Sequence, residues 1–238
     1  MTRVLSVVLM AIPSYLIAIT VHEMGHILVG LAHGFRFDLL IVGPLGLRRN
    51  GEGRVELYLE RNPALWGGVA GVWPRADDSR NLDAFARVLL AGPLATLVFG
   101  AAFLSLSRLT DHPFPGLLGA IAVAISIATL IPVRSGVFHS DGGRWLRIVR
   151  NGRARVVESA MLRLVRSEAT HGTCAHIDIA DTLPLIDNQD AREQYLGHFY
   201  AMRHYRARDN RVMEHRHRLE LERLAPSVPK SLTRLMAP

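Results

Sequence analysis

Long apolar runs alternate with polar segments over the first 150 residues of this 238-residue chain, and the remaining residues are mainly polar. The apolar runs extend over about residues 4–32, 84–107 and 116–133. An α-helix needs about 20 apolar residues to cross the hydrocarbon core of a bilayer, with a working range of about 17–25. The pattern therefore predicts three transmembrane helices within a core domain of residues 1–150.

A shorter, two-residue period marks the segment of residues 35–82, between the first and second apolar runs. Val55, Leu57 and Leu59 alternate with charged residues and a tyrosine, which is the pattern of a half-buried strand. Turn-forming residues 50–53 separate this strand from a second one at residues 45–49. We predict a β-hairpin that lies against the membrane face, with an ordinary interfacial loop as the alternative. An exposed edge of such a hairpin is able to pair with an extended peptide.

Residues 151–238 contain no comparable apolar run but show helical periodicity in three places. These are residues 155–166, 192–205 and 212–224. We predict a helical extension that either binds a regulatory partner or folds onto the transmembrane core. The predicted fold class is a mainly α membrane protein with three transmembrane helices, a membrane-associated β-hairpin and a helical C-terminal extension.

The charge of the chain narrows the choice of partners. The formal net charge is +7, and nearly all of the basic excess is arginine, Lys230 being the only lysine. No stripe of basic residues interleaved with aromatic residues is present, so we do not expect nucleic-acid binding. The arginines cluster beside the predicted spans, where they contact anionic lipid and set orientation. We expect a multi-pass protein of the bacterial cytoplasmic membrane, with its N-terminus outside and its C-terminus in the cytoplasm.

Three ionisable residues, His22, Glu23 and His26, lie within the first apolar run. Positions four apart share one face of a helix, so the two imidazoles are able to bind one metal ion. The glutamate beside them can act on a water molecule, as in the metal-binding helix of zinc peptidases. Ionisable groups within a span are costly unless they serve a function, which argues against a chance arrangement. We predict metal chemistry at these residues.

A catalytic zinc site with two histidines needs a third protein ligand and an open position for water. Asp141 lies in a glycine-flanked turn after the third apolar run and is our candidate. His139, two residues earlier, is a competing ligand, and helix capping ahead of Trp145 is a structural explanation for the aspartate. Cys174 is the only cysteine, so we expect neither an intramolecular disulfide nor a thiolate metal site.

Three sequence motifs lie on or just after the three predicted spans. In chain order they are His22-Glu23-Met24-Gly25-His26, Ala91-Gly92-Pro93-Leu94-Ala95, and Leu130-Ile131-Pro132 followed by Ser140-Asp141-Gly142-Gly143. Together they resemble the site-2 protease family of intramembrane zinc metalloproteases, over about residues 10–150. The resemblance implies a three-helix catalytic core and a membrane-reentrant β-hairpin in residues 35–82. It also implies one Zn²⁺ ion held by His22, His26 and Asp141, with Glu23 activating water.

The chain departs from the family pattern at two threonines. Thr129 stands where the family usually has asparagine, and Thr96 stands where it often does. The interval between Pro132 and Asp141 is also longer than in the commonest form of the family. We expect the hydroxyl groups of Thr96, Thr129 and Ser140 to support substrate binding or the transition state.

The residues and the resemblance point to one reaction and leave two alternatives. The expected activity is hydrolysis of a peptide bond in or near a transmembrane segment of a membrane-protein substrate, with Glu23 as general base. The first alternative is a catalytically inactive, metal-binding family member that acts through partner binding by its C-terminal helices. The second is a metal transporter or sensor, which requires further carboxylates or histidines along an intramembrane path. The predicted spans contain no such additional residues.

Overall fold

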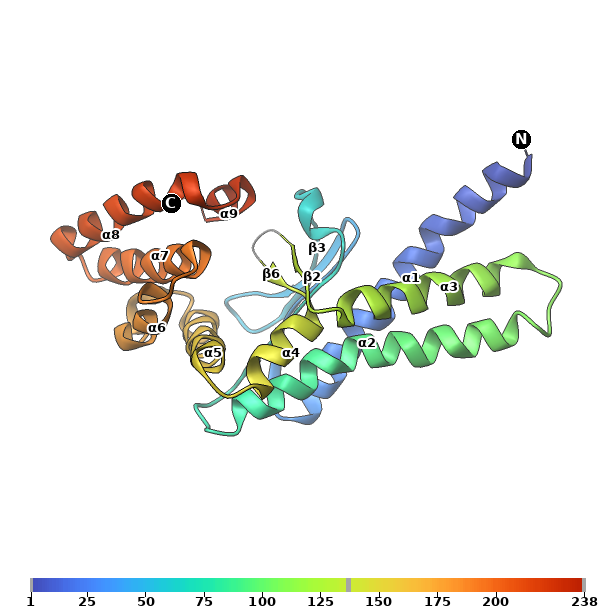
Figure 1. Cartoon of the computed structure of the whole chain (residues 1–238), viewed down its shortest axis with the longest axis horizontal. Helices are drawn as coiled ribbons and strands as arrows, with labels where there is room; N and C mark the ends of the chain where they lie inside the picture. Colours follow the sequence, from blue (N-terminus) through green and yellow to red (C-terminus); the bar gives the residue numbers. More distant parts are fainter. Residues whose placement is uncertain (1, 136–137, 237–238) are drawn as a thin grey trace. The chain divides into compact units, whose positions relative to one another are not determined.

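The computed structural model describes residues 2–135 and 138–236 of the chain (Figure 1). The chain divides into two compact units. The first consists of Met1–Pro74, Asp83–Pro132 and Ser140–Trp145, and the second of Arg75–Leu82, Val133–His139 and Leu146–Pro238. The apolar runs belong to the first unit, and the second unit is built mainly from helices of more polar sequence.

Three long helices carry the apolar runs. They are α1 (Thr2–Ala32), α2 (Asn81–Leu106) and α3 (Pro113–Leu130). In the described part of the chain, Val8–Ala32, Asn81–Leu106 and Pro113–Leu130 are long and apolar enough to cross a membrane. Each of the three predicted spans thus corresponds to a helix of sufficient length and apolarity.

The third of these helices differs from its predicted bounds at both ends. It starts three residues earlier than expected, because the side chain of His112 accepts a hydrogen bond from the backbone N–H of Phe114 and caps the helix. It ends at Leu130 because Pro132 favours extended backbone at the residue before it. Ile131 accordingly has a φ of −62° and a ψ of 125°.

Four strands form one antiparallel sheet in the order β3-β2-β1-β4. They are β1 (Phe35–Val42), β2 (Leu45–Arg49), β3 (Val55–Leu59) and β4 (Val69–Pro74), with the 3₁₀ helix η1 (Pro63–Leu65) ahead of the last strand. The predicted hairpin is present as β2 and β3, but the prediction was incomplete because it omitted the other half of the sheet. The sequence of β1 lacks strict alternation, and a register shift between Phe37 and Leu39 interrupts its pairing with β4.

The β2–β3 hairpin has one aliphatic face and one charged face. Leu45 pairs with Leu59 on the aliphatic face, and Leu57 and Leu59 are each 69% exposed. On the other face Nε of Arg48 lies 2.7 Å from Oε1 of Glu56. The aliphatic side chains of β3 are therefore the exposed ones. A continuous exposed apolar face of this kind is typical of contact with a membrane or with another protein.

The second unit is helical. Its elements are α5 (Arg153–His171), α6 (Leu183–Ile186), α7 (Ala191–Ala207), α8 (Arg211–Leu224), α9 (Lys230–Leu235), the 3₁₀ helices η2 (Cys174–His176), η3 (Ile179–Thr182) and η4 (Ala225–Ser227), and the short strands β5 (Arg134–Ser135) and β6 (Phe138–His139). The three helical segments expected from periodicity correspond to α5, α7 and α8. Helix α4 (Asp141–Val149) starts in the first unit and ends in the second.

The core of the second unit is built from aliphatic and aromatic side chains and includes the single cysteine. Leu164, Leu185, Met202 and Leu232 are each at most 1% exposed. Cys174 belongs to the same buried cluster, and burial raises the pKa of its thiol to about 11. The thiol therefore stays protonated near neutral pH, which makes it a poor nucleophile and metal ligand.

A pair of histidines joins α7 to α8. Nδ1 of His198 lies 2.9 Å from Nδ1 of His217, and the His217 ring stacks on Tyr205 with the ring centroids 5.6 Å apart. One nitrogen has to donate and the other to accept, so at least one ring is neutral in this arrangement. Burial, reinforced by the charge of His217, lowers the pKa of His198 to about 4. Burial and Arg216 lower the pKa of His217, and Glu220 opposes them.

We expect acid to destabilise the chain through this pair. Because the pKa of His198 is about 4 in the folded chain, against an ordinary value of 6.5, the unfolded chain binds more protons as the pH falls. Stability is fully present above about pH 6.5 and is lost as the pH approaches 4. His198→Gln should remove this loss, on the order of 1 kcal/mol because the ring is only half-buried.

Thermal unfolding of the full chain near neutral pH and near pH 5 measures this effect. His215→Gln, at an exposed position of α8, is the control and should keep the pH dependence of the parent chain. An unchanged pH dependence in His198→Gln would contradict the assignment.

Candidate metal centre

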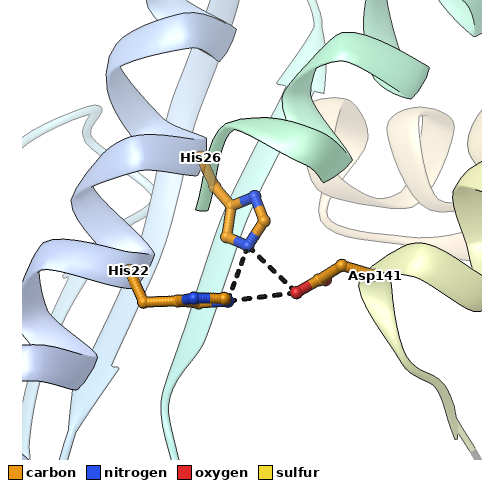
Figure 2. A group of neighbouring side chains, drawn as sticks. All are labelled: His22, His26 and Asp141. Atoms are coloured by element: carbon orange, nitrogen blue, oxygen red, sulfur yellow. Dashed lines mark hydrogen bonds and ion pairs between the residues drawn. The ribbon is translucent and has the colours of Figure 1, made fainter. Parts of the chain in front are cut away.

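Two histidines on one face of α1 meet an aspartate at the start of α4 (Figure 2). Nε2 of His22 lies 3.2 Å from Nε2 of His26 and 3.0 Å from Oδ2 of Asp141. Nε2 of His26 lies 3.5 Å from the same carboxylate oxygen. Both histidines are buried and the aspartate is half-buried. The structure thus brings together the three residues that the sequence suggested as metal ligands.

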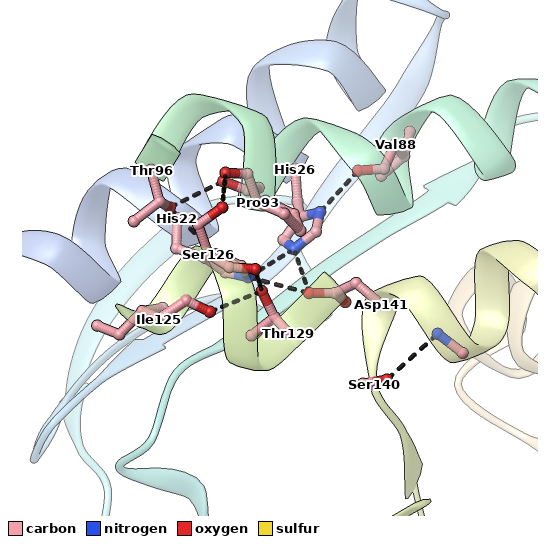
Figure 3. Close-up of polar contacts among 12 residues, drawn as sticks. His22, His26, Val88, Pro93, Thr96, Ile125, Ser126, Thr129, Ser140 and Asp141 are labelled. Atoms are coloured by element: carbon pink, nitrogen blue, oxygen red, sulfur yellow. Dashed lines mark hydrogen bonds and ion pairs between the residues drawn. The ribbon is translucent and has the colours of Figure 1, made fainter. Parts of the chain in front are cut away.

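Hydrogen bonds to the second ring nitrogens fix the protonation of both imidazoles (Figure 3). The carbonyl of Val88 lies 2.6 Å from Nδ1 of His26 and is able only to accept, so this nitrogen carries the proton. The hydroxyl of Thr96 donates its proton to the carbonyl of Gly92 at 2.8 Å. It therefore accepts from Nδ1 of His22, 3.1 Å away. By this assignment from partners, both Nε2 atoms carry a lone pair and no proton.

Three acceptor atoms held this close repel one another unless a cation lies among them. A tetrahedral metal ion with ligand distances of about 2.0–2.2 Å places its ligand atoms about 3.3–3.6 Å apart. The separations of 3.0, 3.2 and 3.5 Å come close to these values. Two imidazoles and one carboxylate are also a donor set that zinc accepts. The residues present fit a divalent metal ion.

Glu23 lies beside this group without belonging to it. The residue is 6% exposed, and the backbone N–H of Ala70 donates a hydrogen bond to its carboxylate. Its Oε1 lies against Gly68, where an added Cβ would come within 2.4 Å of that oxygen. The carboxylate interacts electrostatically with His26 and Asp141. The start of β4 therefore holds a buried carboxylate next to the three candidate ligands.

Two glycines allow neighbouring backbone to approach the ligands. A Cβ on Gly92 would lie 2.3 Å from Nε2 of His26, and a Cβ on Gly142 would lie 1.9 Å from the carbonyl oxygen of Leu130. Gly92 belongs to the second sequence motif, and Gly142 directly follows Asp141. Glycine at these two positions therefore allows close packing. A larger residue at either one would displace a candidate ligand or the helix that carries it.

Of the three hydroxyl residues expected to support substrate, Thr96 contacts a candidate ligand. The hydroxyl of Thr129 donates to carbonyl groups within its own helix, α3. The hydroxyl of Ser140 donates to the carbonyl of Ile131 at 2.7 Å and accepts from the backbone N–H of Gly143 at 3.2 Å. Ser140 thus connects the end of α3 to the first turn of α4. A role of these hydroxyls toward substrate stays a prediction.

Sequence reasoning missed several contacts around the site. The carbonyl of Val88 and the N–H of Ala70 belong to the backbone, so no residue type marks them. Ser126 donates to the carbonyl of Pro93 at 2.8 Å, and a buried serine within an apolar run could have indicated this contact between α2 and α3. His139 is not among the described residues that form the candidate metal group.

Comparison with protein families identifies the chain. The family model described as peptidase family M50 matches residues 10–183. The chain belongs to peptidase family M50. No curated protein and no solved structure matches it. M50 is the site-2 protease family, so the resemblance found in the motifs is confirmed.

Membership of M50 indicates both the chemistry of this chain and its location. M50 peptidases are metalloproteases, and His22, His26 and Asp141 form a group that is able to hold the metal. The family and the three apolar helices also indicate a membrane protein that acts on membrane-protein substrates.

Thr96→Val should weaken metal binding by this M50 chain. Valine has nearly the same shape but cannot accept the proton of His22 Nδ1, so the ring loses the partner that fixes its tautomer. We expect the metal dissociation constant to rise by about 10–100-fold, measured by titrating the purified chain against a competing chelator. Thr96→Ser keeps the hydroxyl and should stay near the parent value. Equal affinity in Thr96→Val and the parent would contradict the assigned hydrogen bond.

Gly142→Ala should move Asp141 away from the histidines. The added methyl group would overlap the carbonyl of Leu130, and a backbone atom in a helix end cannot give way as a flexible side chain does. We expect less bound metal per chain by elemental analysis. Gly51→Ala is the control, because its Cβ meets no atom within 4 Å. Full metal content in Gly142→Ala would show that this close approach does not position the ligand.

Proposed function

We propose that this chain is an intramembrane zinc metalloprotease that hydrolyses a peptide bond in or near a transmembrane segment of a membrane protein. One observation carries the proposal: the histidines of a candidate metal group lie on a helix long and apolar enough to cross a membrane. The family supports metal-dependent peptide hydrolysis. The position of the histidines supports hydrolysis within the bilayer, since ionisable groups in a span usually mark a functional site.

In this proposal Nε2 of His22, Nε2 of His26 and Oδ2 of Asp141 hold one Zn²⁺ ion. When bound, the ion would polarise the scissile carbonyl and lower the pKa of a water molecule. The carbonyl of Val88 and the hydroxyl of Thr96 keep the two rings in the orientation and tautomer that binding needs.

Glu23 serves as the general base. Its carboxylate accepts a proton from the attacking water and then donates that proton to the leaving amine nitrogen. Its position supports this role, because the carboxylate lies next to the ligand group and is not one of the ligands. The N–H of Ala70 orients the carboxylate.

The free edge of the sheet gives an unwound substrate a place to bind. In the described sheet β4 is an edge strand that pairs with β1, and the N–H of Ala70 on β4 reaches Glu23. An extended peptide added along an edge strand forms main-chain hydrogen bonds irrespective of its sequence. This mode suits a substrate helix that has to open before its peptide bonds are accessible. We propose that β4 presents the substrate to Glu23.

The distribution of arginine supports an orientation in the membrane. Residues 35–82 contain seven arginines, and cytoplasmic segments carry the excess of basic residues. The N-terminus then lies outside a bacterial cytoplasmic membrane, and the C-terminal extension lies in the cytoplasm, where a regulatory partner is able to reach it.

Glu23→Gln should abolish cleavage while the chain keeps its zinc. Glutamine cannot take up the proton of the water, and general-base catalysis contributes typically about 10²–10⁴-fold to the rate. Co-expression with candidate single-span membrane proteins, followed by detection of intact and cleaved substrate, measures activity. Elemental analysis of the purified chains measures zinc.

Glu222→Gln is the matched control, because it makes the same change at an exposed position of α8. It should cleave as the parent chain does. Cleavage at the parent rate by Glu23→Gln would contradict the assignment of the general base. A purified parent chain without stoichiometric zinc would contradict the proposed function as a whole.

A further inference from the structure

We propose that Arg144 positions Asp141 for metal binding through its contact with the ring of Phe85. The inference rests on the proposed function, because it concerns how the third ligand of that zinc ion is held. It involves the first unit alone, since Asp83–Pro132 and Ser140–Trp145 both belong to that unit.

A cation–π contact joins α4 to α2. Cζ of Arg144 lies 4.9 Å from the centroid of the Phe85 ring, within the distance at which an aromatic face attracts a guanidinium. Phe85 is 5% exposed. Its ring also stacks on Phe35 at the start of β1, with the centroids 6.5 Å apart and an interplanar angle of 16°. A buried ring packed in this way has little freedom to move, so Arg144 meets a fixed partner.

Each partner of this contact lies about one helical turn from a residue of the metal centre. Positions three apart are neighbours on the surface of a helix, and Arg144 follows Asp141 by three residues on α4. On α2, Val88 follows Phe85 by three residues, and the carbonyl of Val88 holds Nδ1 of His26 at 2.6 Å (Figure 3). The contact therefore connects the helix that carries the third ligand to the segment that orients one of the histidines.

The start of α4 is also held at the end of α3. The hydroxyl of Ser140 donates to the carbonyl of Ile131 at 2.7 Å, and Gly142 packs against the carbonyl of Leu130. These contacts fix α4 relative to α3, and the Arg144 contact fixes it relative to α2. A ligand held in place before the ion arrives loses less conformational freedom on binding, so the chain binds metal more tightly.

Positioning and simple electrostatics predict opposite effects of removing this arginine. A positive charge three residues from a ligand repels a divalent cation, so loss of the charge alone would raise the metal affinity. Loss of positioning would lower the metal affinity. A role confined to stabilising the fold would lower the unfolding temperature and leave the affinity of the folded chain unchanged. The sign of the change in zinc affinity thus distinguishes the three roles.

The experiment uses the full chain purified in detergent and freed of metal. Arg144→Met, Phe85→Leu and the double variant are compared with the parent chain by titration with Zn²⁺ against a competing chelator, and by the visible absorption of bound Co²⁺. Circular dichroism measures the helix content of every variant.

Two substitutions on α2 are the matched controls. Arg87→Met removes a positive charge at an exposed position two residues from Phe85. Phe99→Leu removes a ring about 21 Å further along the same helix. Both controls should bind zinc as the parent chain does.

We expect the zinc dissociation constant to rise by about 10-fold in Arg144→Met and equally in Phe85→Leu, with an altered Co²⁺ spectrum. The double variant should match the single variants, because both changes break one contact. Two independent effects would instead multiply to about 100-fold in the double variant and would overturn the proposal. Parent-like or higher affinity in a folded Arg144→Met would also overturn it.

Arg144→Lys keeps the proposal testable if either single variant loses helix content. Lysine retains the charge but lacks the planar guanidinium, so it contacts the ring less fully. Its zinc affinity should lie below that of the parent chain, and parent-like affinity would contradict the positioning role.

The two levels of the proposal fail in distinguishable ways. Loss of zinc in His22→Ala, together with parent-like affinity in Arg144→Met and Phe85→Leu, would leave the zinc centre intact and overturn the positioning role. A parent chain that binds neither Zn²⁺ nor Co²⁺ would overturn both.

Discussion

The convergence of two imidazole nitrogens and one carboxylate oxygen is the interaction on which the rest of the core depends. Each atom is an acceptor, and the closest pairs are 3.0 Å and 3.2 Å apart. Neutral apolar surroundings cannot offset the repulsion among them. The arrangement therefore needs a cation and a scaffold that keeps the three atoms at fixed positions. Helix α1 provides two of the atoms through its own periodicity. Helix α4 carries the third, and contacts from α2 hold the two imidazoles in place.

Helix α2 contributes to this task mainly through its backbone. The carbonyl of Val88 holds one imidazole, and Thr96 holds the other while satisfying a carbonyl of its own helix. Such contacts require the helix axis to come close, and the missing side chain of Gly92 makes that approach available. In an apolar environment the hydrogen bonds also keep the second nitrogens of both rings from being left without partners. The segment of α2 around Gly92 thus packs closely against α1 and also supplies the hydrogen bonds that orient the two histidines.

The sequence predicted those features that depend on periodicity and residue type. Helical spacing of His22 and His26 within an apolar run predicted the histidine pair, and run length predicted the spans. It could not predict contacts made by backbone atoms, such as those of Val88 and Ala70, because any residue supplies them. Strand β1 was missed because its alternation is broken.

The lengths of the spans have a further consequence. Pro113–Leu130 has 18 residues and Val8–Ala32 has 25, which correspond to about 27 Å and about 37 Å of helix. A hydrocarbon layer of about 30 Å cannot match both if both stand upright, so the longer one has to lean or the lipid has to deform around the shorter one. The shorter one is α3, which ends just ahead of Asp141. Thinning of the lipid around α3 would bring bulk water closer to both ends of this helix, including the end that precedes Asp141.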